Sequence, residues 1–310
     1  MRNQPIYDAV INSGGIAGLT SALRIAQEGG RVAIVEPRGA LLWEICKARQ
    51  HIGDLADFTN EPLPSNPVLS QIVLHDTVRN GIVEPVLMEI AADRIAKDAG
   101  VDLYFQSRVV GSLEEGDDLQ IVLAQKGRMH TLSSRRLVQF IDEKHNAIDD
   151  QVTPTDPEMD IYTITFANSS IDKELHTTLN LPSCDVAVRV RPTSWENECY
   201  VDIAFPIMDS KEHASELEFA MVYEHLILKL KEQIPALREG IPIYLSDEPW
   251  RWRTSAREAN VVSSKGIEQR MIRTERVDYT FSWDKCLMDV QQLFVFGEKV
   301  GSAASMGTIT

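Results

Sequence analysis

Three glycines and one acidic residue near the start of the chain have the spacing of a phosphate-binding turn. Gly14, Gly15 and Gly18 follow the apolar run Asp8–Ile11, and Glu36 ends a second apolar run about 20 residues after the turn. Gly15 lets the backbone approach a pyrophosphate, and Gly18 lets the following helix pack closely on the strand. The exposed N–H groups and the positive dipole end at the start of a helix hold phosphate charge, and the Glu36 carboxylate can accept hydrogen bonds from a ribose. The pattern therefore predicts a dinucleotide site.

The elements around the turn form a strand–helix–strand unit. Apolar residues at helical spacing run from Leu19 to Ala26, Gly29–Gly30 ends the helix, and Arg31–Val35 gives a second buried strand. Ser13 stands where the first glycine of the G-x-G-x-x-G pattern belongs. An ordinary strand–helix–strand unit with a glycine turn and no ligand is the alternative interpretation of these residues.

The run GGIAGLTSALRIAQEGGRVAIVEPRGALLWE resembles the flavin-dependent oxidoreductases of the glutathione-reductase-like superfamily, most specifically over residues 7–44. The resemblance implies FAD, with its ADP half along this unit. The family carries glycine in the loop where this chain has Leu41 and Leu42. The implied cofactor-binding residues are Ser13, Gly14, Gly15, Ile16, Ala17, Gly18, Glu36, Pro37, Arg38, Trp43, Val109, Val110, Asp142, Gly297 and Glu298.

Two later stretches carry the rest of the resemblance. In the family, the backbone after the arginine of the strand Arg108–Leu113 lies against the adenine, a role that falls to Val109 and Val110. The strand Leu137–Asp142 ends in Asp-Glu-Lys-His, where the family has Asp-Ala-Thr-Gly. This departure places bulky charged groups near the expected pyrophosphate.

The last apolar run, Leu293–Phe296, is predicted as a buried strand that leads into Gly297–Gly301. It resembles the superfamily's late strand-to-glycine motif, after which a helix points at the flavin. The sequence stops at Thr310, before a helix of useful length. We therefore expect that another chain completes the flavin side, that the natural protein is longer, or that a reduced, flavin-free form exists.

The order of elements predicts an α/β protein. We expect a Rossmann-like FAD/NAD(P)-binding domain with a parallel central sheet, formed by residues 1–150 and 286–310, and an inserted mixed α+β substrate or cap domain at 151–285. The supporting predictions are a helix over 83–99, strands over 101–105 and 108–113, a hairpin around Lys126–Gly127, strands over 160–166, 185–190 and 200–205, and a helix over 211–237.

Composition limits the class of protein. The chain has 310 residues and a net charge of −15, which disfavours nucleic acid and anionic membranes as main partners. No apolar run is long enough to span a bilayer and the N-terminus is no signal peptide, so we expect cytoplasmic residence. The four cysteines form no CxxC pair and signal no zinc site.

Aromatic and basic residues concentrate in Pro249–Arg253. Such a cluster can stack a ring and anchor an anion, but we favour an interdomain or subunit contact. Residues 254–276 lack a clear apolar period and suggest a mobile segment or an interface. None of the seven histidines lies in a motif that selects it as a catalytic base.

The expected function is hydride transfer between a small organic substrate and bound flavin. The alternative is a flavoprotein-fold subunit without its own cofactor, or sharing one, that acts as partner or scaffold in a hetero-oligomer. NAD in place of FAD is a third interpretation, because the glycine pattern alone does not separate the two.

Overall fold

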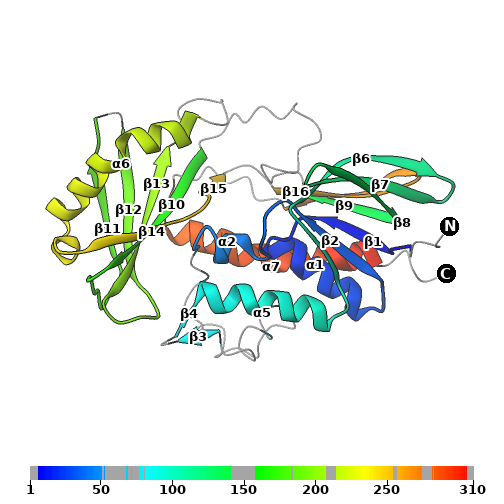
Figure 1. Ribbon diagram of the computed structural model, residues 1–310, viewed down its shortest axis with the longest axis horizontal. Helices are drawn as coiled ribbons and strands as arrows, with labels where there is room; N and C mark the ends of the chain where they lie inside the picture. The colour runs from blue at the N-terminus through cyan, green and yellow to red at the C-terminus, as the bar shows by residue number, and fades with distance from the viewer. Residues whose placement is uncertain are drawn as a thin grey trace.

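The computed structural model describes residues 6–50, 52, 68, 71, 77–79, 81–140, 158–182, 184–206, 214–253, 257–273, 281 and 283–305. These residues form two lobes (Figure 1). The first lobe contains a largely parallel sheet with helices packed on it, and the second contains an antiparallel sheet with one long helix. The predicted α/β fold class, with a parallel central sheet and a second mixed part, is confirmed.

Six strands form the sheet of the first lobe, in the spatial order β17–β16–β9–β1–β2–β5. Strand β1 pairs in parallel with β2 and β9, and β2 pairs in parallel with β5. Every residue of β1 and β2 is buried, as expected for a parallel sheet covered on both faces. The bounds are β1 Ala9–Asn12, β2 Val32–Glu36, β5 Asp102–Phe105, β9 Arg136–Phe140, β16 Arg257–Ser263 and β17 Gly266–Arg273.

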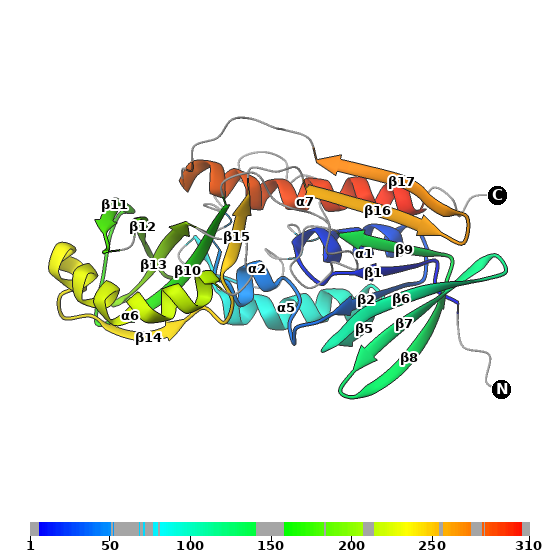
Figure 2. The ribbon, with the colours of Figure 1, turned by 90° about the horizontal axis from the view of Figure 1, so that it is seen from above.

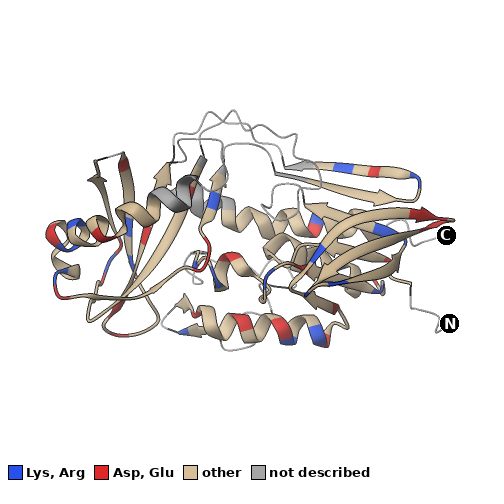
Figure 3. Cartoon of the chain, turned by 45° about the horizontal axis from the view of Figure 1, so that its top comes forward, with Lys and Arg blue, Asp and Glu red and all other residues tan. Residues whose placement is uncertain are grey.

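The helices of the first lobe are α1 (Ile16–Gln27), α2 (Trp43–Cys46), α5 (Pro85–Asp98) and α7 (Trp283–Ser305). Helix α5 begins at a proline, and the side chain of Glu84 caps it by accepting the amide of Leu87 at 2.7 Å. Helices α1 and α7 lie side by side (Figure 2). Basic and acidic residues are interspersed along the elements of both lobes, α5 among them (Figure 3).

A three-stranded antiparallel sheet flanks the first lobe, in the order β6 (Ser107–Glu115), β7 (Asp118–Gln125) and β8 (Arg128–Ser134). The turn between β7 and β8 contains Gly127 at φ +77° and Lys126 at φ +45°, which confirms the predicted hairpin. A shorter pair, β3 (Val78–Arg79) and β4 (Ile82–Val83), precedes α5.

The second lobe is built on a sheet in the order β11–β12–β13–β10–β14, with β15 also paired to β10. Helix α6 (Ala214–Gln233) buries Phe219, Leu226 and Leu230 in the core of this lobe. The short 3-10 helix η1 (Pro235–Leu237) follows it. The strands are β10 Glu158–Ala167, β11 Leu175–Asn180, β12 Asp185–Pro192, β13 Glu198–Pro206, β14 Ile241–Leu245 and β15 Trp250–Arg253. The predicted strands and helix of this region are confirmed.

One prediction about the end of the chain is wrong. Residues 293–296 form no strand, because they lie inside α7, where Val290, Leu293, Phe294 and Val300 supply a buried helical face. The predicted strand-to-glycine motif therefore does not exist. Residues 257–273 are an antiparallel hairpin paired to β9, so strands within the range predicted for the substrate domain extend the first sheet.

The aromatic–basic stretch around β15 packs inside the molecule. Trp250 and Trp252 are buried in the core of the first lobe, and the Trp252 ring meets Phe281 edge-on at 5.3 Å. The Arg251 guanidinium donates to Asp160 at 2.9 Å. This agrees with an interdomain contact, one of the two forms of the favoured interpretation, because β15 pairs with β10 of the second lobe.

Candidate functional site

The predicted phosphate-binding turn lies between β1 and α1. Gly15 is the N-cap of α1 in an extended conformation, and its amide donates to the Ser13 hydroxyl at 3.1 Å. Ser13 is fully buried and does not have a positive φ. A serine therefore replaces the first glycine of the pattern without backbone strain, and its hydroxyl binds the turn internally.

Gly18 has a steric role in this turn. A β-carbon at Gly18 would lie 2.1 Å from the carbonyl oxygen of Ser13, so helix α1 packs this closely on the turn only with glycine there. The packing role predicted for Gly18 is confirmed.

Glu36, at the end of β2, lies directly beside the turn. One of its carboxylate oxygens accepts the Gly14 amide at 2.6 Å, and the other accepts the Arg38 amide at 2.9 Å and the Arg38 guanidinium at 3.1 Å. The Glu36 side chain is completely buried. The structure thus brings the predicted acid and the predicted glycine turn together.

The segment of residues 38–44, here called the cover segment, lies against the turn. The Leu42 amide donates to the Gly14 carbonyl at 2.7 Å, and Leu42 adopts φ 50° and ψ 41°, the left-handed conformation that favours glycine. The Leu41 side chain would lie 2.8 Å from a β-carbon at Gly14. Both leucines are fully buried, so they fill the space beside the turn where the resembling family has glycine.

Two charged side chains complete the cover segment. The Arg38 guanidinium lies 3.9 Å from the ring centre of Trp43 and donates to Glu248 of the second lobe at 2.9 Å. Both carboxylate oxygens of Glu44 lie 3.1 Å from the amide nitrogen of Ile16, the first residue of α1. Glu44 is 4% exposed, and sequence reasoning gave it no role.

The other predicted cofactor residues are scattered. Val109 is buried, and Val110 is 48% exposed at a register shift of β6. Asp142 lies outside the described residues. Gly297 and Glu298 lie in the middle of α7, and a β-carbon at Gly297 would be 2.5 Å from the Ala17 carbonyl oxygen. Gly297 is thus a helix-crossing glycine, and the prediction of a cofactor turn there is wrong.

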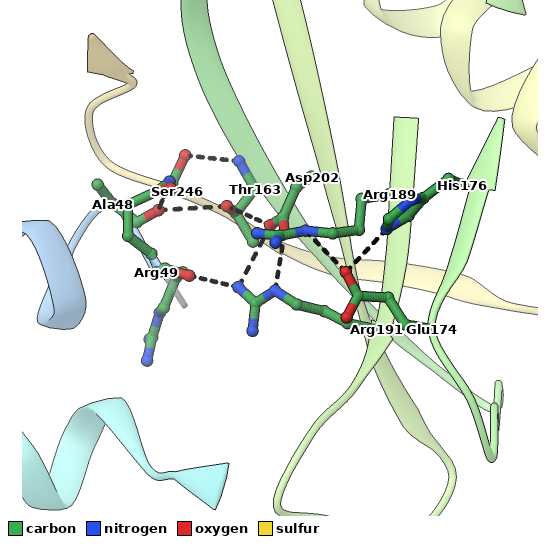
Figure 4. Close-up of polar contacts among 10 residues, drawn as sticks. Ala48, Arg49, Thr163, Glu174, His176, Arg189, Arg191, Asp202 and Ser246 are labelled. Carbon is green, nitrogen blue, oxygen red and sulfur yellow. Dashed lines mark hydrogen bonds and ion pairs between the residues drawn. The ribbon is translucent and has the colours of Figure 1, made fainter. Parts of the chain in front are cut away.

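A second polar cluster lies on the second sheet where it faces the first lobe (Figure 4). Arg189 and Arg191 are on one face of β12, and their Nε atoms donate to the same oxygen of Asp202 on β13, at 2.9 Å and 2.7 Å. Thr163 donates to Asp202 at 2.8 Å. The guanidinium of Arg189 lies 4.6 Å from the ring centre of Trp283 of α7.

This arginine cluster also contacts the segment that follows α2. The Arg191 guanidinium donates to the Arg49 carbonyl, and the Thr163 hydroxyl lies 3.2 Å from the Ala48 carbonyl (Figure 4). Burial alone would raise the pKa of Asp202, but Arg191 and Arg189 outweigh it and lower the pKa to about 2. Asp202 is therefore ionised and holds both arginines in place. The i, i+2 spacing of the arginines was the available sequence signal, but their shared partner depends on strand register.

Within the described residues, neither the Cys46 thiol nor a set of metal ligands provides a further reactive site. Burial raises the pKa of the Cys46 thiol strongly, which makes it a poor nucleophile. The described residues contain no group of three or more side chains able to hold a metal ion. Within the part of the chain that the structure describes, no helix is long and apolar enough to span a membrane.

No protein-family model matches the sequence, and no curated protein is significantly similar to it. The structure is similar to that of a geranylgeranyl bacteriochlorophyll reductase-like protein from Thermoplasma acidophilum, with a TM-score of 0.62 and 14% identity over 98% of this chain and 79% of that one. It is also similar to a flavoprotein/dehydrogenase from Cytophaga hutchinsonii, with a TM-score of 0.58 and 13% identity over 98% of this chain and 79% of that one.

A third similar structure is aklavinone-11 hydroxylase in complex with FAD and aklavinone, with a TM-score of 0.57 and 12% identity over 99% of this chain. This chain spans 64% of the length of that hydroxylase. Identities this low show the fold alone. The chain shares the Rossmann-type fold of these proteins, which include an FAD-bound hydroxylase and a flavoprotein.

Proposed function

We propose that the chain is an FAD-dependent oxidoreductase of the glutathione-reductase-like superfamily, which transfers a hydride between a small organic substrate and bound flavin. The observation that carries the proposal is the Glu36 carboxylate, 2.6 Å from the Gly14 amide beside the start of α1. This is where a dinucleotide-binding unit needs a ribose acceptor next to a phosphate-binding helix end. The fold shared with flavin-dependent enzymes supports FAD as the dinucleotide.

The backbone around the turn fits the ADP half of FAD. The amides at the start of α1 would hold the diphosphate, Ser13, Gly14 and Gly15 would form its turn, and Glu36 would bind the ribose. The cover segment lies over this frame, so residues 38–44 must shift for the ligand to enter. Pro37 and Arg38 would then border the adenosine.

The remaining cofactor contacts belong to the proposal, except for two residues of α7. Backbone groups of Val109 and Val110 would border the adenine, Asp142 the pyrophosphate and Trp43 the path toward the flavin. Gly297 and Glu298 are excluded, because α7 packs Gly297 against α1. When bound, FAD would supply the hydride acceptor or donor, and the protein would supply position and electrostatics.

The arginine cluster has a positioning role in this proposal. Asp202 fixes Arg189 and Arg191, and these two side chains tie the second sheet to Trp283 and to the Arg49 carbonyl. The contacts hold the second lobe at a fixed place relative to the segment that follows α2. A substrate bound between the lobes would therefore contact side chains whose positions are fixed. We also propose that a second chain completes the flavin side of the site.

The test is reconstitution with FAD. We expect protein incubated with FAD and freed of excess ligand to show the visible absorption of bound flavin, and the bound flavin to bleach with a hydride donor under anaerobic conditions. Glu36→Gln should weaken FAD binding by at least about tenfold, because a hydrogen bond to a charged group contributes about 1.5–3 kcal/mol. The matched control is Glu232→Gln, in an exposed ion pair of α6, which should leave binding unchanged. Protein that stays colourless with FAD contradicts the proposal and favours the scaffold alternative.

A further inference from the structure

We infer that the cover segment occupies the dinucleotide site of the ligand-free chain with its own charged groups, so that a dinucleotide binds only by displacing Glu44 and Arg38. The inference rests on the proposed function, because it concerns the same site. It makes residues 38–44 an autoinhibitory contact within the nucleotide-binding lobe.

Glu44 takes the place of an anionic ligand at helix α1. The helix has no side-chain cap from its N-cap residue and no acidic residue in its first turn, so near its positive end the local sequence supplies the neutral Ser13 hydroxyl, on the Gly15 amide, but no negative charge. Glu44 of α2 supplies one, with both oxygens 3.1 Å from the Ile16 amide nitrogen and only 4% of the residue exposed. A diphosphate at the same helix end would meet this buried negative charge, and the two anions repel each other.

Arg38 takes the place of the ribose hydroxyls at Glu36. A ribose would donate to the Glu36 carboxylate, but both carboxylate oxygens already accept protein donors and the side chain has no exposed surface. Arg38 is held there by Glu248 at 2.9 Å and by the face of the Trp43 ring. The hold on Arg38 therefore comes partly from the second lobe, outside the nucleotide-binding unit.

Leu41 and Leu42 add apolar packing to the contact between the cover segment and the turn. Leu41 and Leu42 are fully buried, and the Leu42 amide is bound to the Gly14 carbonyl. A shift of the segment takes both leucines out of the core, which costs free energy unless the ligand covers them again. The unmodified chain should accordingly bind dinucleotides less tightly than variants in which the cover segment is released.

The test measures dissociation constants of FAD and of ADP-ribose by isothermal titration calorimetry, together with the melting temperature of the ligand-free protein. Glu44→Gln keeps the size and an acceptor oxygen but removes the charge. We expect it to bind both ligands about tenfold more tightly and to melt about 2–4 °C lower when ligand-free. If Glu44 had only a structural role, its substitution would not raise the affinity for both ligands while lowering the melting temperature.

Glu248→Gln is the second variant, because it releases Arg38 from a partly exposed partner without altering the turn. It should also tighten binding of both ligands, and it keeps the inference testable if Glu44→Gln does not fold. Glu28→Gln, in an exposed ion pair at the other end of α1, is the matched control and should change neither affinity.

The outcomes separate this inference from the proposed function. Unchanged or weaker binding in both variants, with FAD still reduced in the parent protein, overturns the inference and leaves the function standing. Tighter binding of both ligands without reduction of bound flavin supports the inference and overturns the function. Absence of any binding of FAD or ADP-ribose in all variants overturns both.

Discussion

Replacing Asp202 by asparagine should destabilise the protein severely. The substitution is nearly isosteric, so it leaves no cavity, but it removes the negative charge that the buried Arg189 and Arg191 share. The side chains of these arginines are only 3% and 5% exposed, so water does not compensate them. Breaking a buried ion pair from one side costs about 3–5 kcal/mol, a large part of the 5–15 kcal/mol that typically holds a protein folded.

The pH dependence gives a second measure of the same contact. The folded-state pKa of Asp202, about 2, lies below its ordinary value of 3.8. The stabilisation is therefore fully present above about pH 4 and is lost as the pH falls through about 2. The difference corresponds to about 2–3 kcal/mol. Asp202→Asn should lack this component of acid destabilisation.

Urea unfolding followed by tryptophan fluorescence would report the effect, because the Trp283 ring lies under the Arg189 guanidinium. Asp185→Asn, at an exposed position that starts the same strand as the arginines, is the control and should stay within about 0.5 kcal/mol of the parent protein. A loss below about 1 kcal/mol for Asp202→Asn, the value of an exposed ion pair, would refute the reasoning.

Two glycine substitutions test the packing of α1. Gly18→Ala should lower the unfolding free energy by about 1–3 kcal/mol or more, because its methyl group would lie 2.1 Å from the Ser13 carbonyl oxygen; thermal melting measures this. Gly297→Ala should have a comparable cost, since its methyl group would lie 2.5 Å from the backbone of α1, and urea titration would detect it. Gly111→Ala, with no atom within 4 Å, is the control for both, and equal effects at all three positions would contradict the packing argument.

Local patterns were sufficient for the first strand–helix–strand unit. A run such as Val32–Val35 is buried on both faces, and Gly18 falls where the helix meets the turn, so sequence spacing and structure agree. The hairpin around Lys126–Gly127 was equally readable, because turn residues with positive φ mark it. These features depend on neighbours in the sequence.

The errors arose where the partner is distant. A short apolar run such as Leu293–Phe296 does not distinguish a strand from one face of a buried helix. Gly297 has the sequence context of a turn residue, but the structure shows that it is a glycine because α1 packs against it. Strand β17 carries the exposed polar residues Glu268, Gln269 and Arg270, so its apolar pattern is weak. Glu44 and the arginine pair were missed as functional groups because their partners are set by tertiary contacts and strand register.

The pairing of β16 with β9 has a consequence for synthesis on the ribosome. When the nascent chain has reached Phe140, one edge of its central sheet and the α7-facing side of α1 have no cover, because β16 and α7 come much later in translation. An open strand edge invites pairing with other chains. A fragment cut after β9 should therefore aggregate, and chaperones are expected to bind the growing polypeptide until its last helix has emerged.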